Sequence, residues 1–410
     1  MGRPEIRFKG YTDEWEQRKL GDLVDRVTRK NQDLVSELPL TISAQYGLID
    51  QNEFFDKRVA SKDVSGYYLI ENGEFAYNKS TSTDAPWGAI KRLDRYENGV
   101  LSTLYIIFGI KENNPVDSDF LVSYYSTNLW HKGIHEIAAE GARNHGLLNI
   151  APADFFETKL MIPQDIEEQK KIGKYFEELE RLITLHQRKC DEVKTLKKYM
   201  LQKMFPQNEQ KVPEIRFEGF TEAWEQRKLG DWGNFYYGRS CPKWSVTEDA
   251  TIPCIRYGEL YTKFGAKIDR VYSYTNMPPE NLRFSKGTEV LIPRVGEDPM
   301  DYNHCTWLSM QDVAIGEMIS VFNTDNNPLF TATMFNATLQ NEFAMRVEGG
   351  SVTNLYFEKL KNIDVSFPSI PEQEKIAAYF ENFDHLITLH QQKCEELKKI
   401  KKFMLQKMFV

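Results

Sequence analysis

Two blocks of this 410-residue sequence occur twice, and this internal repeat restricts the possible folds more than any other feature of the chain. Residues 4–22 return as residues 213–231 with 15 of 19 positions identical, and residues 182–205 return as residues 386–409 with 18 of 24 identical. Chance does not produce such agreement. The chain is therefore a tandem duplication in which shared segments alternate with variable ones.

The second repeated block is predicted to belong to a long helix. No proline lies between Glu167 and Met204, and apolar side chains recur at alternating steps of four and three residues, the pattern of a helix that packs on one partner. The first stripe is Ile172, Phe176, Leu179, Ile183, His186, Cys190 and Val193, and the second is Ile376, Phe380, Phe383, Ile387, His390, Cys394 and Leu397. Because the stripes match, we expect the two helices to pack on each other in antiparallel fashion. A metal site formed by the His and Cys residues is the weaker alternative, since such pairs on an apolar stripe usually serve interhelical packing.

The variable segments, about residues 24–160 and 233–365, contain short β-type runs mixed with turn sequences. They align only weakly with each other, through residues 74–79 with 289–294 and residues 140–141 with 348–349. A kept scaffold with diverged segments indicates two modules of one fold that have different targets.

These patterns predict an α+β chain with two α/β modules joined by two long antiparallel coiled-coil helices, as a pseudo-two-fold tandem repeat. The expected boundaries are residues 1–160 for the first module, 161–207 for the first helix, 208–365 for the second module and 366–410 for the second helix. At 1.5 Å per residue, each helix would be roughly 55 Å long.

Composition and missing motifs exclude several classes of protein. No run approaches the roughly 18 apolar residues of a membrane helix, the N-terminus lacks a signal peptide's apolar core, and the five cysteines are widely scattered, so we expect a reduced cytoplasmic protein. A GxxxxGK[ST] phosphate loop, an HExxH zinc motif and a GxSxG nucleophile elbow are all absent, which favours a chain without a catalytic centre. The net charge of −8 counts weakly against nucleic-acid binding, because acidic residues can lie on a face turned away from DNA.

Particular short sequences give the chain a resemblance to the specificity subunits of type I restriction–modification systems, over essentially its whole length. They are the twice-repeated opening, Pro4–Phe8 with Trp15–Asp22, and the close of each variable segment, Ile162-Pro163 with Glu168–Ile172 and Ile370-Pro371 with Glu372–Ile376.

The resemblance implies a division of labour. Each variable segment would be a target-recognition domain that reads one half of a split site in double-stranded DNA, and the helices would be the spacer between the halves. Two modification subunits would carry S-adenosylmethionine and methylate adenine, and two restriction subunits would use ATP and Mg for cleavage and translocation. The chain itself would hold no cofactor and no metal.

Polar loops are the candidate DNA contacts of the first module. The run Tyr77, Asn78, Lys79, Ser80 and Thr81 follows a short apolar stretch, and hydrogen-bonding side chains at a strand end suit base-edge and phosphate contacts. Arg143, Asn144 and His145, which lie between glycines, are a second candidate, and Gln45 is a weaker third. The alternative for each is an ordinary surface turn.

Arginine-containing loops are the candidates of the second module. Arg294 aligns with Lys79, and both Arg256-Tyr257 and Arg294 lie near a glycine that permits close backbone approach. Further candidates are Arg239, Asn303, His304, Ser351 and Thr353.

Two questions stay open at this level. The lysine-rich helix ends, 194–198 and 398–402, could contact phosphates, dock modification subunits or form a solvated face. The main alternative for the whole chain is a two-headed protein-interaction scaffold without DNA binding, which would show no salt-dependent affinity for duplex DNA.

Overall fold

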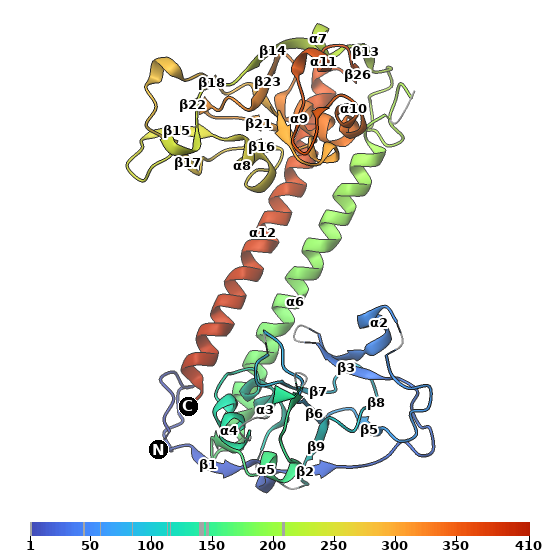
Figure 1. Ribbon diagram of the computed structural model, residues 1–410, viewed down its shortest axis with the longest axis vertical. Coiled ribbons are helices and arrows are strands. Elements are labelled where there is room, and N and C mark those ends of the chain that lie inside the picture. Colours follow the sequence, from blue (N-terminus) through green and yellow to red (C-terminus); the bar gives the residue numbers. More distant parts are fainter. Residues whose placement is uncertain are drawn as a thin grey trace. The chain divides into compact units, whose positions relative to one another are not determined.

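The computed structural model describes all residues except 1, 44–45, 58, 84, 113, 115, 139–142, 145–146 and 207–209. It divides into two compact units, Met1–His186 with Lys393–Val410, and Gln187–Gln392. The two long helices are α6 (Ile166–Lys203) and α12 (Ile370–Met408), and each contributes one part of its length to each unit (Figure 1). Each unit therefore combines one variable segment with segments of both helices.

The first unit is built on an antiparallel sheet with strand order β2-β9-β6-β7. Both faces of this sheet are covered. Phe75 and Tyr77 of β6 face one apolar core, while Ala76 between them faces a second one. The strands are β2 (Val24–Val27), β6 (Phe75–Asn78), β7 (Ala89–Arg92) and β9 (Ile106–Ile110).

The main sheet of the second unit has the same order, β14-β23-β19-β21, with β16 added at its edge. It is also buried on both faces, since Val290 and Ile292 of β19 lie in one core and Leu291 in another. The two variable segments therefore share one fold, as the weak alignment predicted. The strands are β14 (Gly233–Tyr237), β16 (Lys267–Ile268), β19 (Glu289–Pro293), β21 (Thr306–Leu308) and β23 (Ile319–Thr324).

A smaller set of strands also repeats in each unit. In the second unit the sheet order is β17-β15-β22-β18, and β15 and β22 run parallel. In the first unit β3 pairs with β4 and β5 with β8, and a parallel bridge from Pro39 to Val100 joins the two pairs. The strands are β3 (Leu40–Ser43), β4 (Gly47–Asp50), β5 (Tyr68–Glu71), β8 (Asn98–Leu101), β15 (Ile252–Ile255), β17 (Ser273–Thr275), β18 (Phe284–Lys286) and β22 (Gln311–Ile315).

Short helices accompany the strands of both units, and one pair of them occupies matching positions. The pair α3 and α9 begins in the same way in both units, because Asp117 and Asn327 each accept a hydrogen bond from a backbone N–H three residues later. The helices are α1 (Leu20–Leu23), α2 (Gln51–Phe55), α3 (Ser118–Tyr124), α4 (Trp130–Ile137), α5 (Pro152–Phe156), α7 (Leu229–Trp232), α8 (Tyr257–Thr262), α9 (Pro328–Thr338), α10 (Gln340–Ala344) and α11 (Phe357–Leu360).

The long helices pack antiparallel within each unit, which confirms the sequence-based expectation. In the first unit Phe176 of α6 lies against Phe409, which follows α12, with ring centroids 5.8 Å apart, and Glu180 pairs with Lys401. In the second unit Phe205 lies against Phe380 at the same 5.8 Å, and Lys197 pairs with Asp384 at 2.5 Å. Each contact in one unit is the repeat equivalent of the contact in the other.

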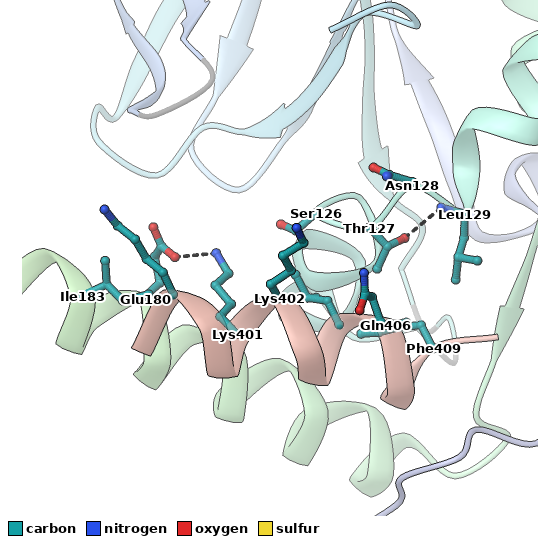
Figure 2. A pocket seen from close by; sticks show the side chains of 12 residues that line it. Ser126, Thr127, Asn128, Leu129, Glu180, Ile183, Lys401, Lys402, Gln406 and Phe409 are labelled. Carbon is teal, nitrogen blue, oxygen red and sulfur yellow. Dashed lines mark hydrogen bonds and ion pairs between the residues drawn. The ribbon is translucent and has the colours of Figure 1, made fainter. Parts of the chain in front are cut away.

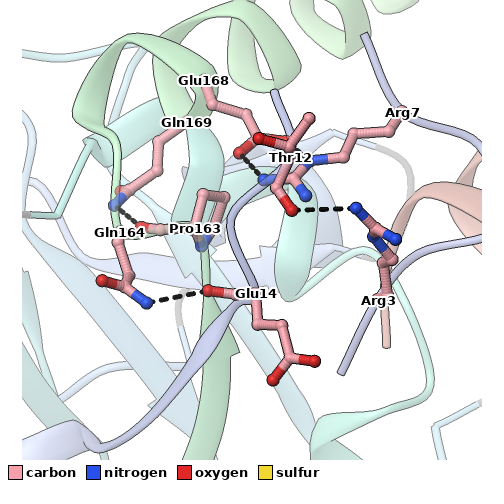
Figure 3. A network of polar contacts seen from close by, with 8 residues as sticks. All are labelled: Arg3, Arg7, Thr12, Glu14, Pro163, Gln164, Glu168 and Gln169. Carbon is pink, nitrogen blue, oxygen red and sulfur yellow. Dashed lines mark hydrogen bonds and ion pairs between the residues drawn. The ribbon is translucent and has the colours of Figure 1, made fainter. Parts of the chain in front are cut away.

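The repeated opening sequence anchors each module to the start of a long helix. In the first unit β1 (Glu16–Lys19) pairs with β12 (Lys159–Ile162), and the Arg7 guanidinium donates two hydrogen bonds, of 2.6 and 2.7 Å, to the buried Glu168 carboxylate (Figure 3). The second unit repeats this with β13 (Glu225–Lys228), β26 (Asp364–Phe367) and the pair Arg216–Glu372. Strands β12 and β26 extend past residues 161 and 366, so the helices begin slightly later than expected.

Candidate nucleic-acid interface

The two polar regions expected in each module meet at one strand end. Lys79 follows β6, and its carbonyl oxygen accepts a 3.0 Å hydrogen bond from the N–H of Leu148 in the hairpin β10–β11 (Arg143–Asn144 and Leu147–Leu148). Arg294 follows β19, and its carbonyl oxygen accepts a 2.8 Å bond from Leu355 N–H, next to the hairpin β24–β25 (Glu348–Gly349 and Thr353–Asn354). The alignment of Lys79 with Arg294 is therefore also a structural equivalence.

Polar and charged groups gather at this position in the first module. Asn78 is half-buried and its side-chain oxygen accepts a 3.0 Å hydrogen bond from Ser80 N–H, a local turn that leaves Ser80 exposed. Burial and the nearby charge of Arg26 lower the pKa of Lys79. Thr81 follows, half-buried. These four residues remain candidates for DNA contact.

Tyr77 does not belong with them. Its ring is fully buried, stacks on Phe155 with centroids 5.0 Å apart, and its hydroxyl donates a 2.8 Å hydrogen bond to the Trp87 carbonyl. The expectation that Tyr77 contacts DNA is therefore wrong, because the hydroxyl has an internal partner and neither base nor phosphate can reach the ring.

The remaining candidates of the first module are only partly described. Gln45 and His145 lie outside the described residues. Arg143 and Asn144 form the backbone of β10, which pairs with Leu148 and Leu147, and their side chains are not described.

The candidates of the second module converge on β20 (Val295–Gly296), directly after Arg294. Thr353 and Asn354 of the hairpin pair with this strand, and Ser351 is exposed at the hairpin tip, where Gly349 has a φ of 129°. The Tyr261 hydroxyl of α8, the helix that begins at Tyr257, donates a 3.0 Å hydrogen bond to the Val295 carbonyl.

Two neighbours complete the surroundings of β20. The His304 ring lies 5.3 Å from the Tyr261 ring, and Asn303 donates a side-chain hydrogen bond to the Asn336 carbonyl. Thr353 is buried, and its hydroxyl donates a 3.0 Å hydrogen bond to the Gly296 carbonyl, so the expectation that it contacts DNA is wrong. The hydroxyl instead holds the hairpin on β20.

Four arginines surround the turn at residues 316–318 between β22 and β23. We call Arg239, Arg256, Arg283 and Arg294 the arginine cluster. Their backbones approach this turn closely: Arg239 N–H donates to the Ile315 carbonyl at 2.7 Å, and the Arg283 carbonyl accepts from Ile315 N–H at 2.9 Å. The Arg256 Cα lies 3.8 Å from an ideal Cβ built on Gly316, and the Arg294 side chain reaches the Glu317 carbonyl at 3.5 Å.

The arginine cluster carries positive charge that no ion pair with a described residue offsets. None of the four forms an ion pair with any residue that the structure describes. The nearby Glu317 carboxylate accepts a 2.6 Å bond from Cys241 N–H. Gly238 allows the close crossing at the centre of the cluster, because a Cβ there would lie 2.0 Å from the Gly316 carbonyl oxygen. The cluster is a ready anion-binding surface.

A second surface lies on the C-terminal part of α12 in the first unit. A groove of about 560 Å³ is lined by the apolar residues Ile183, Leu405 and Phe409 and by Lys398, Lys401 and Lys402. Figure 2 shows Lys401 and Lys402 on one helix beside Gln406 and Phe409. Lys402 points toward Ser126 of the α3–α4 loop, and Lys401 pairs with Glu180. The charge of Lys401 adds to burial in lowering the pKa of the nearby Lys91.

The helical wall of this groove exists twice in the chain. Its lysines correspond to Lys194, Lys197 and Lys198 of α6, and three other wall residues also have identical repeat equivalents: Leu405 with Leu201, Gln406 with Gln202, and Phe409 with Phe205. The strand-end residues Lys79 and Arg294, by contrast, differ. The lysine-bearing surface of the long helices is therefore the same in both repeats, whereas the surface at the ends of β6 and β19 differs between them.

The described residues contain no cluster of three or more His, Cys, Asp or Glu side chains that could hold a metal ion. Within the same part of the chain, no helix is both long and apolar enough to cross a membrane. Cys190 and Cys394 of the long helices are buried and are not joined in a disulfide bond.

The sequence matches the family described as the type I restriction modification DNA specificity domain, over residues 12–195 and again over residues 221–399. The chain belongs to this family. The two matches coincide with the two modules and the long helices that follow them, so the specificity domain occurs twice in tandem.

Individual relatives agree over nearly the full length. A putative type I restriction enzyme MjaX specificity subunit from Methanocaldococcus jannaschii is 22% identical over 407 residues, covering 95% of this chain and 91% of that protein. The crystal structure of a type I restriction–modification S subunit from M. genitalium is similar with a TM-score of 0.62, 15% identity and 99% coverage of both chains. A chain from a structure on complex assembly and conformational transition of the type I R-M system has a TM-score of 0.50 and 17% identity, over 97% of this chain and 98% of that one.

Sequence reasoning on this specificity-domain chain missed Arg283 and the tyrosines around Arg294. Arg283 lies in no motif, and it joins the arginine cluster through its backbone bond with Ile315 and through the 2.7 Å bond that its guanidinium donates to the Tyr237 carbonyl. A usable signal was the run Tyr236 to Arg239, which combines two aromatic residues, a glycine and an arginine soon after the repeated block.

Proposed function

We propose that this chain is the DNA-sequence-specificity subunit of a type I restriction–modification complex, and that it recognises a bipartite, asymmetric site in double-stranded DNA. The observation that carries the proposal is that the two modules share one fold but have different residues at the ends of equivalent strands. Sheet order and hairpin attachment agree between the modules, but Lys79 stands where the other module has Arg294. Two modules with the same fold but different polar side chains at this position suit the recognition of two different half-sites.

The strand-end groups supply the chemistry that such reading needs. Exposed cations neutralise phosphates and fix the position of the protein, while donors and acceptors on side chains distinguish base edges. The arginine cluster and Ser351 would do this in the second module, and Arg26, Asn78, Lys79 and Ser80 in the first. The net charge of −8 does not oppose this proposal, because these cations are local.

The long helices support a split site with an unread gap. A helix of 38 residues, the length of α6, is about 57 Å long. One turn of B-DNA spans about 34 Å, so a spacer of this length suits two half-sites at least one turn apart.

The duplicated helix surfaces support a complex with two copies of one partner. A surface that occurs twice with the same residues can bind the same protein twice, and we assign this role to two modification subunits. These would carry S-adenosylmethionine and methylate adenine within the recognised site, and two restriction subunits would supply cleavage with ATP and Mg. The chain itself would direct this chemistry in the cytoplasm without catalysing it.

Mapping methylated adenines tests the proposal. The chain is expressed with its modification partner in a host that lacks other adenine methylation, and the methylated positions are read by sequencing. We expect one asymmetric motif made of two short specified parts around unspecified base pairs. A continuous motif, a palindrome or the absence of any motif would contradict the proposal.

The alternative, a two-headed protein-interaction scaffold without DNA binding, is favoured only by the acidic net charge. Duplex-DNA titrations of the purified chain at increasing salt separate the two. Affinity that falls steeply with salt supports a DNA reader, and no measurable affinity at low salt supports the scaffold.

A further inference from the structure

The side chain of Arg294 contacts two aromatic rings, and its backbone is held by hydrogen bonds on both sides. Its guanidinium carbon lies 4.5 Å from the centroid of the Tyr237 ring and 5.3 Å from that of the Tyr356 ring. Its backbone is fixed as well, by the 3.3 Å bond from its N–H to the Met318 carbonyl and the 2.8 Å bond from Leu355 N–H to its own carbonyl. An arginine held in this way loses little conformational freedom when it binds a ligand.

Most hydrogen-bond donors of this guanidinium are unused. Among the described residues its side chain makes one hydrogen bond, a long contact of 3.5 Å from Nη1 to the Glu317 carbonyl. Nε is shielded from solvent and has no acceptor in the same part of the chain. A half-buried cation without a carboxylate partner is costly for a folded protein, so a structural role accounts poorly for it. The arrangement suits a group that waits for an external acceptor.

The equivalent position of the first module has a different construction. Lys79 occupies the same place relative to its hairpin, but the positions that correspond to Tyr237 and Tyr356 are Thr28 and Asn149. A lysine ammonium is a mobile point charge, whereas an arginine guanidinium is a rigid planar fork. The two modules therefore differ at this position in geometry as well as in residue type.

The surroundings of Arg294 suit the major groove. The strand β20 and the hairpin β24–β25 form a narrow three-stranded ribbon beside Arg294, with Ser351 exposed at its tip. The major groove of B-DNA admits a β-ribbon, and the fork of an arginine matches the O6 and N7 acceptors of guanine.

We infer that Arg294 is a specificity-determining residue that reads one guanine in the half-site of the second module, and that Tyr237 and Tyr356 are the positioning residues that hold its guanidinium in place. This inference rests on the proposed function, since it names the base read by one of the two modules.

The test uses the full chain in complex with its modification partner and a library of duplexes randomised at every specified base pair. For the wild type we expect one base pair of the second half-site at which guanine, on either strand, is required. Arg294→Lys should weaken the preference for guanine at that base pair. Discrimination against the other three bases there should fall about 10- to 100-fold, while the first half-site stays unchanged. Arg294→Gln should lose the guanine preference at the same base pair.

Arg270→Lys is the matched control, because Arg270 is an exposed arginine of the same module that pairs with Asp269 and lies outside the arginine cluster. It should leave the recognised sequence unchanged. Three outcomes overturn the inference: equal weakening at all sequences, which indicates a phosphate contact; no change in the motif; or loss of the first half-site as well, which indicates a structural role. A wild-type complex with no motif at all would refute the proposed function itself.

Discussion

Two residues of the first module that lie two positions apart in the sequence have opposite roles. Tyr77 lies inside β6, where Phe155 and Trp130 cover its ring, and burial raises the pKa of its hydroxyl. Lys79 lies just beyond the strand, where the sheet ends and the hairpin β10–β11 begins. Whether a side chain serves the core or the surface is therefore decided by where the strand ends.

Tyr77→Phe tests this distinction at the residue scale. The substitution removes the hydroxyl that donates to Trp87 while it keeps the ring, so the free energy of unfolding should fall by about 1 kcal/mol, measured by urea denaturation. The recognised DNA sequence should stay the same. Lys79→Ala is the counterpart. It should lower the affinity for DNA, while the free energy of unfolding should change by no more than about 0.5 kcal/mol. A changed motif in Tyr77→Phe would return that residue to the interface.

The long helices are tied to their modules by a repeated polar network at their first turns. Glu168 and Glu372 are fully buried, and Gln169 and Gln373 each accept a backbone N–H from the start of α3 or α9. The same elements are joined in the same way in both units. This agreement explains why the opening sequence is kept in both copies although it is far from the strand ends.

Glu168→Gln and Glu372→Gln form a matched pair at the element scale. Each leaves a half-buried arginine without its charged partner, so each should destabilise its own unit by about 3–5 kcal/mol. Hydrogen exchange read strand by strand can localise the effect. We expect faster exchange in β2 and β9 for Glu168→Gln, and in β14 and β23 for Glu372→Gln. Equal acceleration in both units by either variant would show that the network does not act locally.

The whole molecule consists of two units, and each has its own cores, built from one variable segment and segments of both long helices. The first unit has cores on both faces of its main sheet, and so has the second, from separate residues. Since neither module borrows its sheet from the other, the reading surfaces can diverge independently.

Exchange of residues 24–160 for the corresponding segment of another specificity subunit tests this independence. One half of the methylated motif should change and the other half should be preserved, because the second module keeps its own core and strand ends. Exchange of residues 233–365 should give the reciprocal result. A change in both halves after a single exchange would contradict the modular arrangement.

The tandem repeat, the two long antiparallel helices and the common fold of the modules were determined by the sequence alone, because a duplicated block and a 3–4 apolar spacing are local patterns. Only the tertiary structure shows that the strand ends meet the hairpins. Lys79 and Leu148 are joined by a hydrogen bond although 69 positions of sequence separate them, so no local pattern can reveal the contact. Tyr77 was misassigned because β6 is buried on both faces, so its sequence lacks the alternation that separates core from surface. Arg283 was missed because a cluster assembled from four separate loops and strands has no spacing that a sequence can display.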